Sequence, residues 1–187
     1  MAGLWIFGMG EALLVESRLG NSPWTVLAEG AGEQTGIGVG AATVAISFLV
    51  LAAWIPLREL PGLGTIANAI VIGVSIGVTV SVLPRLDELP VRLAEVAVGI
   101  GVVAIGSGFY LMTRLGAGPR DGLMLGLHRR TGLSVRLVRT GIEGSATALG
   151  FALGGKVGIG TLAFALLIGP GVQAALAAFS TTPAHEL

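Results

Sequence analysis

Charged side chains at helical spacing suggest a path for a proton or a charged solute in the second half of this 187-residue chain. Arg139 and Glu143 are four residues apart, so on a helix they share one face and can pair. Arg136 lies one turn before Arg139 and makes this face basic. A carboxylate inside an apolar segment can exchange protons near neutral pH, which makes Glu143 a candidate titrating group. The competing interpretation is a neutralised ion pair with a structural role.

Arg120 and Asp121 form a second charged pair, directly after Pro119. Because proline favours the first position of a helix, we expect this pair at a helix start, where aspartate is ordinarily a partner of the helix dipole. The functional interpretation is that Arg120 meets an anionic substrate while Asp121 orients it.

Three more polar residues interrupt apolar runs, where such side chains are costly and often functional. Glu11 and Glu16 fall in the first run and Asn68 in the third. For the two glutamates, the alternative is a position at the wet end of a short helix. An amide such as Asn68 usually hydrogen-bonds to a neighbouring helix, and a ligand contact is the minority interpretation.

The remaining chemistry argues against an enzyme. The sequence offers no set of nucleophile, base and orienting residue, it has no cysteine, and its histidines are His128 and His185. A thiolate or histidine metal centre is therefore not expected. We likewise expect no cofactor and no nucleic-acid partner.

Composition places these residues in a membrane. The chain is 53% hydrophobic and 12% charged, and its mean hydropathy is +0.86. A soluble domain has about 25% charged residues, so this chain cannot cover a globular surface with polar side chains. The sequence predicts an all-α polytopic membrane protein in one compact membrane domain.

A helix that spans a bilayer needs about 20 mostly apolar residues. Six segments are predicted spans: 3–15, 38–57, 65–83, 91–112, 137–153 and 160–179. The first has no basic leader and contains Glu11, so it is not a signal peptide. Its shortness suggests a late start or a helix that spans only in part.

Arginines predict the orientation, because basic residues near span ends favour the cytoplasm. The connection between the fourth and fifth spans is the richest in arginine, with Arg114, Arg120, Arg129 and Arg130. If this connection is inside, six spans place both termini in the cytoplasm.

The chain also matches itself without a gap when it is shifted by 96 positions. The paired segments include 18–20 with 114–116, Pro23 with Pro119, 35–36 with 131–132, and 62–65 with 158–161. The two copies, residues 1–90 and 91–187, then hold three predicted spans each, and an odd number inverts the second copy in the membrane. Inverted repeats are the plan of many secondary transporters, with the substrate site between the copies. A symmetric helix bundle is the alternative.

The first connection of each copy carries a short segment that begins with proline. Pro23-Trp24 and Pro119 each begin a moderately apolar run that ends at a Thr-Gly pair. Such runs are too short to span and fit re-entrant or interfacial helices. Two re-entrant helices from opposite faces would bring their N-termini together and favour an anion or a polar ligand. A surface helix anchored by Trp24 is the alternative.

Several of these segments resemble one known family. They are Leu19-Gly20-x-x-Pro23-Trp24, the run from Leu115 to Met124, Arg136-Leu137-Val138-Arg139-Thr140-x-x-Glu143, and Gly158-Ile159-Gly160-Thr161. They are similar to segments of the YczE/YitT-like bacterial integral membrane proteins, over almost the whole chain. The resemblance implies a multi-pass protein of the bacterial plasma (inner) membrane, a transporter or permease without a settled substrate.

We therefore expect a small secondary transporter or exporter that moves a small anionic or amphipathic solute with proton coupling. Its expected partners are the lipid bilayer and this small-molecule substrate, and a homodimer is left open. Two other classes also stay open. One is a substrate-binding membrane subunit of a larger transport assembly, and the other is a regulatory or scaffold membrane protein without transport.

Overall fold

The computed structural model describes residues 1–113 and 116–179, and within these ranges the chain is helical and has no strand. Arg114 and Leu115 of the internal match, and His185, lie outside the described residues. The helices are α1 (Ala2–Ser17), α2 (Pro23–Thr35), α3 (Val39–Ala52), α4 (Trp54–Leu57), α5 (Leu63–Val82), α6 (Leu89–Met112), α7 (Pro119–Thr131), α8 (Val135–Ala152) and α9 (Ile159–Phe179).

The two short helices α2 and α7 begin and end in the same way. Each has proline in its first turn after an extended residue, which is the position where proline's missing N–H costs nothing. Each ends at a glycine in the left-handed conformation, Gly36 with φ 76° and Gly132 with φ 72°. The bounds of α2 and α7 are 96 residues apart, as are the first residues of α3 and α8 and those of α5 and α9.

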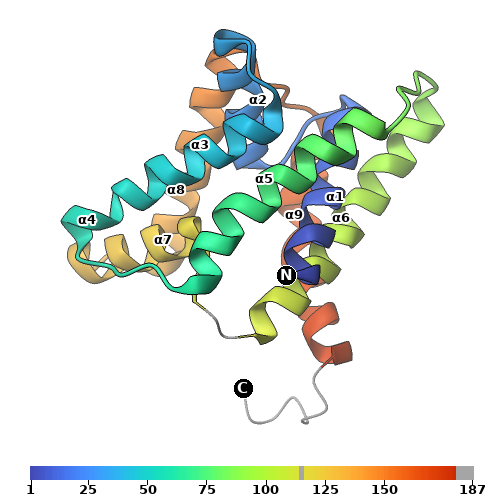
Figure 1. The fold of residues 1–187 in the computed structure, drawn as a ribbon. Coiled ribbons are helices and arrows are strands. Elements are labelled where there is room, and N and C mark those ends of the chain that lie inside the picture. Colours follow the sequence, from blue (N-terminus) through green and yellow to red (C-terminus); the bar gives the residue numbers. More distant parts are fainter. Residues whose placement is uncertain (114–115, 180–187) are drawn as a thin grey trace.

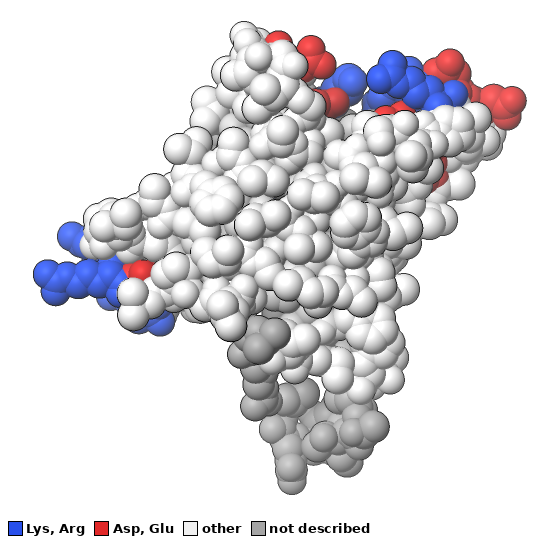
Figure 2. Space-filling model, in the orientation of Figure 1, with Lys and Arg blue, Asp and Glu red and all other residues white. Residues whose placement is uncertain are grey.

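The chain is a membrane protein. Among the described residues, four helical segments are long and apolar enough to cross a bilayer: Val39–Leu57, Leu63–Val82, Leu89–Met112 and Ile159–Phe179. They correspond to four of the six predicted spans. The other two predicted spans correspond to α1, which has only 16 residues, and to α8, which contains Arg136, Arg139 and Glu143. Figure 2 shows charged side chains at two opposite ends and an uncharged band between them.

The two charged ends differ in composition. At the arginine-rich end, formed by residues 56–62 and 128–134, Arg129 pairs with Glu59 and Arg130 donates to the Pro56 carbonyl at 2.6 Å. At the mixed-charge end, formed by residues 18–38, 83–88 and 153–158, Lys156 Nζ lies 3.2 Å from Glu29 Oε1. There Arg18 donates to Asp87 and holds the pKa of that carboxyl below its ordinary value.

Small residues bring the long helices together. α1 packs against α5 and α6, α3 against α5, and α9 against α6 (Figure 1). Without a hydrophobic force between helices in lipid, such contacts depend on close approach of the backbones. At the crossing of α3 and α5, a Cβ on Gly40 would lie 2.5 Å from the Gly73 carbonyl oxygen and 2.6 Å from the Gly77 nitrogen.

This crossing gives a test of the fold. Gly40→Ala should lower the free energy of unfolding by about 1–3 kcal/mol, because the added methyl group meets backbone that cannot move aside. Gly101→Ala is the matched control, since a Cβ on Gly101 meets nothing within 4 Å among the described residues. That control should be neutral or stabilising by up to about 1 kcal/mol. Thermal unfolding in detergent measures both, and equal melting temperatures would contradict the crossing.

Candidate functional site

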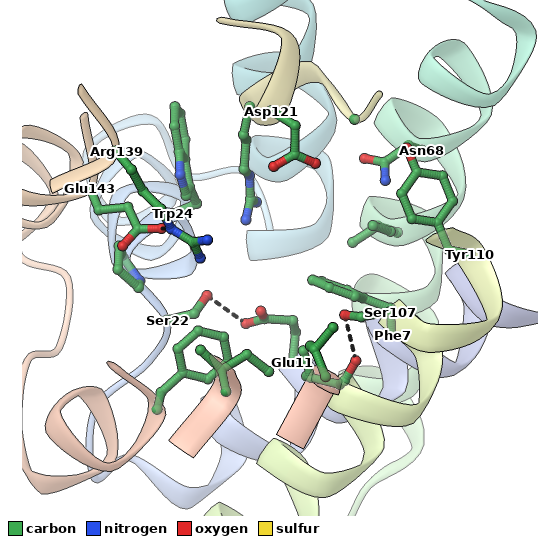
Figure 3. Close-up of a pocket in the computed structure, with 18 of the residues that line it drawn as sticks. Phe7, Glu11, Ser22, Trp24, Asn68, Ser107, Tyr110, Asp121, Arg139 and Glu143 are labelled. Atoms are coloured by element: carbon green, nitrogen blue, oxygen red, sulfur yellow. Dashed lines mark hydrogen bonds and ion pairs between the residues drawn. The ribbon is translucent and has the colours of Figure 1, made fainter. Parts of the chain in front are cut away.

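A cavity of about 430 Å³ lies in the middle of the molecule, within the size range of sites for small molecules (Figure 3). Every helix except α3 and α4 contributes to its wall. Its polar lining includes Glu11, Ser22, Asn68, Ser107, Tyr110, Arg120, Asp121, Arg139 and Glu143. Much of the apolar lining comes from α1, α5, α6 and α9, including Phe7, Ile72, Val103, Phe164, Ile168 and Val172.

The first turns of α2 and α7 both reach this cavity. Ser22 and Gly118 precede the two prolines, and neither makes a side-chain hydrogen bond that caps its helix. The N-terminus of a helix carries partial positive charge on its unpaired N–H groups. The cavity therefore lies beside two helix ends of the same sign, both of which favour a negative partner.

Glu11 of α1 lies at the bottom of the cavity in Figure 3 and is only 1% exposed. Ser22 Oγ and Thr25 Oγ1, from the start of α2, both donate to its Oε2 atom at 2.8 Å. The other oxygen, Oε1, is buried and has no hydrogen-bond partner among the described residues. An unpaired buried carboxylate oxygen is costly unless it holds a proton or meets a ligand.

Arg120, at the start of α7, is half-buried at the cavity. Its guanidinium carbon lies 5.0 Å from the ring centroid of Trp24, within the range of a cation–π interaction. No carboxylate oxygen of the described residues lies within 4.0 Å of this guanidinium, and no acceptor there takes a hydrogen bond from it. The cavity thus presents a cation that makes no close ion pair, although the carboxylates of Glu11, Asp121 and Glu143 interact with it at longer range.

Arg139 and Glu143 of α8 occupy another side of the cavity. Arg139 Nε donates to Glu143 Oε1 at 2.9 Å, and the two side chains are 58% and 38% exposed. An ion pair with this much exposure contributes little to stability. Opposite them in Figure 3, Asp121, Asn68 and Tyr110 form a polar wall.

Hydrogen bonds to three carbonyl groups hold the start of α7 in place. Trp54 Nε1 donates to the Pro119 carbonyl at 2.9 Å, Thr65 Oγ1 to the Ala117 carbonyl at 2.7 Å, and Tyr110 Oη to the Gly116 carbonyl at 2.7 Å. The Trp54 ring also covers Gly122, where a Cβ would lie 2.0 Å from ring carbon Cζ2. Residues of three other helices therefore position Arg120.

Most of the residues singled out from the sequence line this cavity: Glu11, Pro23, Trp24, Asn68, Pro119, Arg120, Asp121, Arg139 and Glu143. Glu16 does not; it is buried toward the mixed-charge end, 3.9 Å from Arg85. Sequence reasoning missed Thr25, Trp54 and Tyr110. A signal for Trp54 was available, because position 54 matches Gly150 across the 96-residue shift and a tryptophan opposite a glycine marks a difference between the copies.

No group of three or more metal-ligating side chains is found among the described residues. The site consists of carboxylates, guanidiniums and hydroxyls around an open volume, which can bind a charged solute and hold a proton.

Comparison with known proteins places these features in a family. The model of a family of unknown function (DUF6198) matches residues 1–176. An uncharacterised protein of Haemophilus influenzae is 45% identical, covering 91% of this chain and 78% of the relative. The uncharacterised membrane protein YczE of Bacillus subtilis is 33% identical over 90% of this chain and 79% of its own length. No solved structure matches the chain.

The contact between Trp54 and Pro119 can be tested directly. Trp54→Phe should lower the free energy of unfolding by about 1–3 kcal/mol, because the buried Pro119 carbonyl loses its hydrogen-bond donor. Trp5→Phe is the control, since Trp5 is 40% exposed on the apolar band. Melting temperatures in detergent compare the two variants, and an equal shift would mean that Trp54 does not hold α7.

Proposed function

This chain belongs to the DUF6198 family, a YczE-like family, and from that premise we propose that it is a secondary transporter. It moves a small anionic solute across the bacterial plasma membrane together with a proton. The cavity is the solute site, Arg120 binds the anion, and Glu11 carries the proton.

The single observation that carries the proposal is that one cavity holds a guanidinium without a close ion pair and a carboxylate with one oxygen that lacks a hydrogen bond. Arg120 has no carboxylate oxygen within 4.0 Å among the described residues, and Glu11 Oε1 has no hydrogen-bond donor. A binding site for an anion needs the first, and a proton carrier needs the second. The proposal gives the proton to Glu11 instead of Glu143, because Glu143 is more exposed and already paired with Arg139.

The charges in the cavity give a reason for coupling. Three carboxylates (Glu11, Asp121 and Glu143) face two guanidiniums (Arg120 and Arg139), an excess of one negative charge if all are ionised. A bound anion would increase that excess next to the buried Glu11, where charges interact more strongly than in water. A proton on Glu11 offsets the added charge, so the solute and the proton stabilise each other's binding.

Two inverted halves fit this function. Six helices, α1, α3, α5, α6, α8 and α9, would cross the membrane, with α2 and α7 re-entrant from opposite faces. The halves also hold each other's short helices: Thr65 at the start of α5 donates to Ala117 before α7, and Gly160 at the start of α9 donates to the Leu19 carbonyl before α2. Secondary transporters with inverted repeats place their site at such an interface.

The proton role of Glu11 has a matched control on the same helix. In proteoliposomes, a panel of labelled monovalent carboxylates and alkyl sulfates should include a solute that accumulates under an imposed pH gradient. Glu11→Gln should abolish that accumulation and retain exchange of internal for external solute, because the solute site stays while the proton site is lost. Glu16→Gln, equally buried but outside the cavity, should keep both activities. If no anion accumulates with the native protein, or if Glu11→Gln accumulates normally, the proposal is wrong.

The proposed orientation can be tested separately because the native chain has no cysteine. We expect the arginine-rich end in the cytoplasm. On intact cells, a membrane-impermeant maleimide should label Glu88→Cys at the mixed-charge end and leave Leu133→Cys unlabelled until the cells are opened. Both positions are exposed. Labelling of Leu133→Cys on intact cells would show that the orientation is the opposite of the proposed one.

A further inference from the structure

Two equivalent pairs of helices differ in how closely they pack. In the first half, α3 and α5 cross where Gly40 meets Gly73 and Gly77. In the second half, the matching positions are Arg136 on α8 and Gly169 and Gln173 on α9. Larger side chains replace two of the three glycines, so α8 and α9 cannot approach in the same way.

The cavity is open where these two helices separate. Gly169 lines the cavity, yet a Cβ at this position would meet nothing within 4 Å among the described residues. A Cβ on its counterpart Gly73 would lie 2.5 Å from a methyl group of Val44. Figure 1 shows α8 and α9 diverging toward the arginine-rich end, while α9 packs on α6. We call this opening, bounded by Arg139 and Glu143 of α8 and by Gly169 and Gln173 of α9, the α8–α9 portal.

The surroundings of the portal are apolar on the outside and basic along the entry path. Exposed leucines lie on both helices, Leu137 and Leu149 on α8 and Leu166 and Leu167 on α9. Arg136 is exposed at the first turn of α8, and Arg139 and Arg120 line the cavity. The leucines favour lipid outside the opening, and the arginines next to it favour an anionic group.

We propose that the solute is an amphiphile with one anionic head and one short apolar chain, which enters sideways from the membrane through the α8–α9 portal. This rests on the proposed transport function and names its substrate class. The head passes Arg136 and Arg139 and binds Arg120, and the chain lies against Ile168 and Val172 of α9. A cavity of about 430 Å³ fits a single short chain and is too small for a phospholipid with two long chains.

A second copy of the protein could also cover α8 and α9. It would present further apolar side chains to the exposed leucines, but it would bring no anion to Arg120. The Arg120 guanidinium, which makes no close ion pair inside the cavity, therefore favours the amphiphile.

Tryptophan quenching in lipid nanodiscs tests the proposal in the full chain. The probe is 11-bromoundecyl sulfate, whose bromine quenches nearby indole, in a Trp5→Phe background that removes the exposed tryptophan. Quenching should saturate and should depend on Trp24, so that Trp24→Phe in the same background loses the saturable part. Undecyl sulfate should reverse the quenching, and methyl sulfate, which has the same head without the chain, should not do so at the same concentration.

The portal has a matched pair of variants. Gly169→Phe should raise the apparent Kd of the bromine probe about tenfold by filling the opening. Gly101→Phe places the same side chain on an exposed face of α6 outside the cavity and should change the Kd less than twofold. Both glycines have room for a side chain, so a general loss of folding is not expected to separate them.

Three results would overturn the inference. In the first, methyl sulfate displaces the probe as effectively as undecyl sulfate does. In the second, Gly169→Phe and Gly101→Phe change the Kd equally. In the third, light scattering shows that the native protein is a dimer and that Gly169→Phe is a monomer. The first result would mean that the solute is a water-soluble anion. The third would mean that a second copy of the protein covers this face. Transport is judged by the proteoliposome assay alone. If only an anion without an apolar chain accumulates, the portal is refuted and the transport function stands. If quenching is saturable but no solute accumulates, the transport function is refuted and the portal stands as a binding site.

Discussion

Two helices begin in the interior of this membrane protein, and the unpaired N–H groups of their first turns need polar surroundings. An unpaired backbone group in a nonpolar environment costs several kcal/mol, so such helix starts are stable only beside polar protein groups or water. Side chains around α2 and α7 hydrogen-bond to hydroxyl and carbonyl groups at these two starts. Glu11 accepts from Ser22 and Thr25 at the start of α2, and Trp54, Thr65 and Tyr110 hold the carbonyls before and within the first turn of α7. These contacts place polar groups beside the starts of both short helices.

Neighbouring helices approach α2 more closely than α7. Gly150 of α8 allows its backbone to touch α2, where a Cβ would lie 2.5 Å from the Leu27 nitrogen. At the matching position α7 meets the large ring of Trp54. A similar exchange of glycine for larger residues separates α8 from α9. The second half is therefore the looser one, and the cavity opens on its side.

The sequence was sufficient for the helices and for the charged residues of the cavity lining. Runs of apolar residues, prolines at helix starts and Thr-Gly at helix ends predicted bounds within a few residues, because these signals are local. The internal match then brought Pro23 and Pro119 to one site. Glu16 shows where sequence reasoning fails. It is buried on α1 as Glu11 is, but it lies on a different part of the helix and faces Arg85 instead of the cavity. The roles of Trp54 and Tyr110 depend on contacts with distant backbone carbonyls, so the difference between the copies at position 54 could mark Trp54 without assigning its contact.

The exchange of contacts between the halves has a consequence for biosynthesis. The chain before α2 is bound by Gly160, which leaves the ribosome some 140 residues later, and the chain before α7 is bound by Thr65, which is already in the membrane. During insertion the contact before α7 can form at once, whereas the contact before α2 waits for the last helix. One bond of the N-terminal half therefore forms only when synthesis is nearly complete.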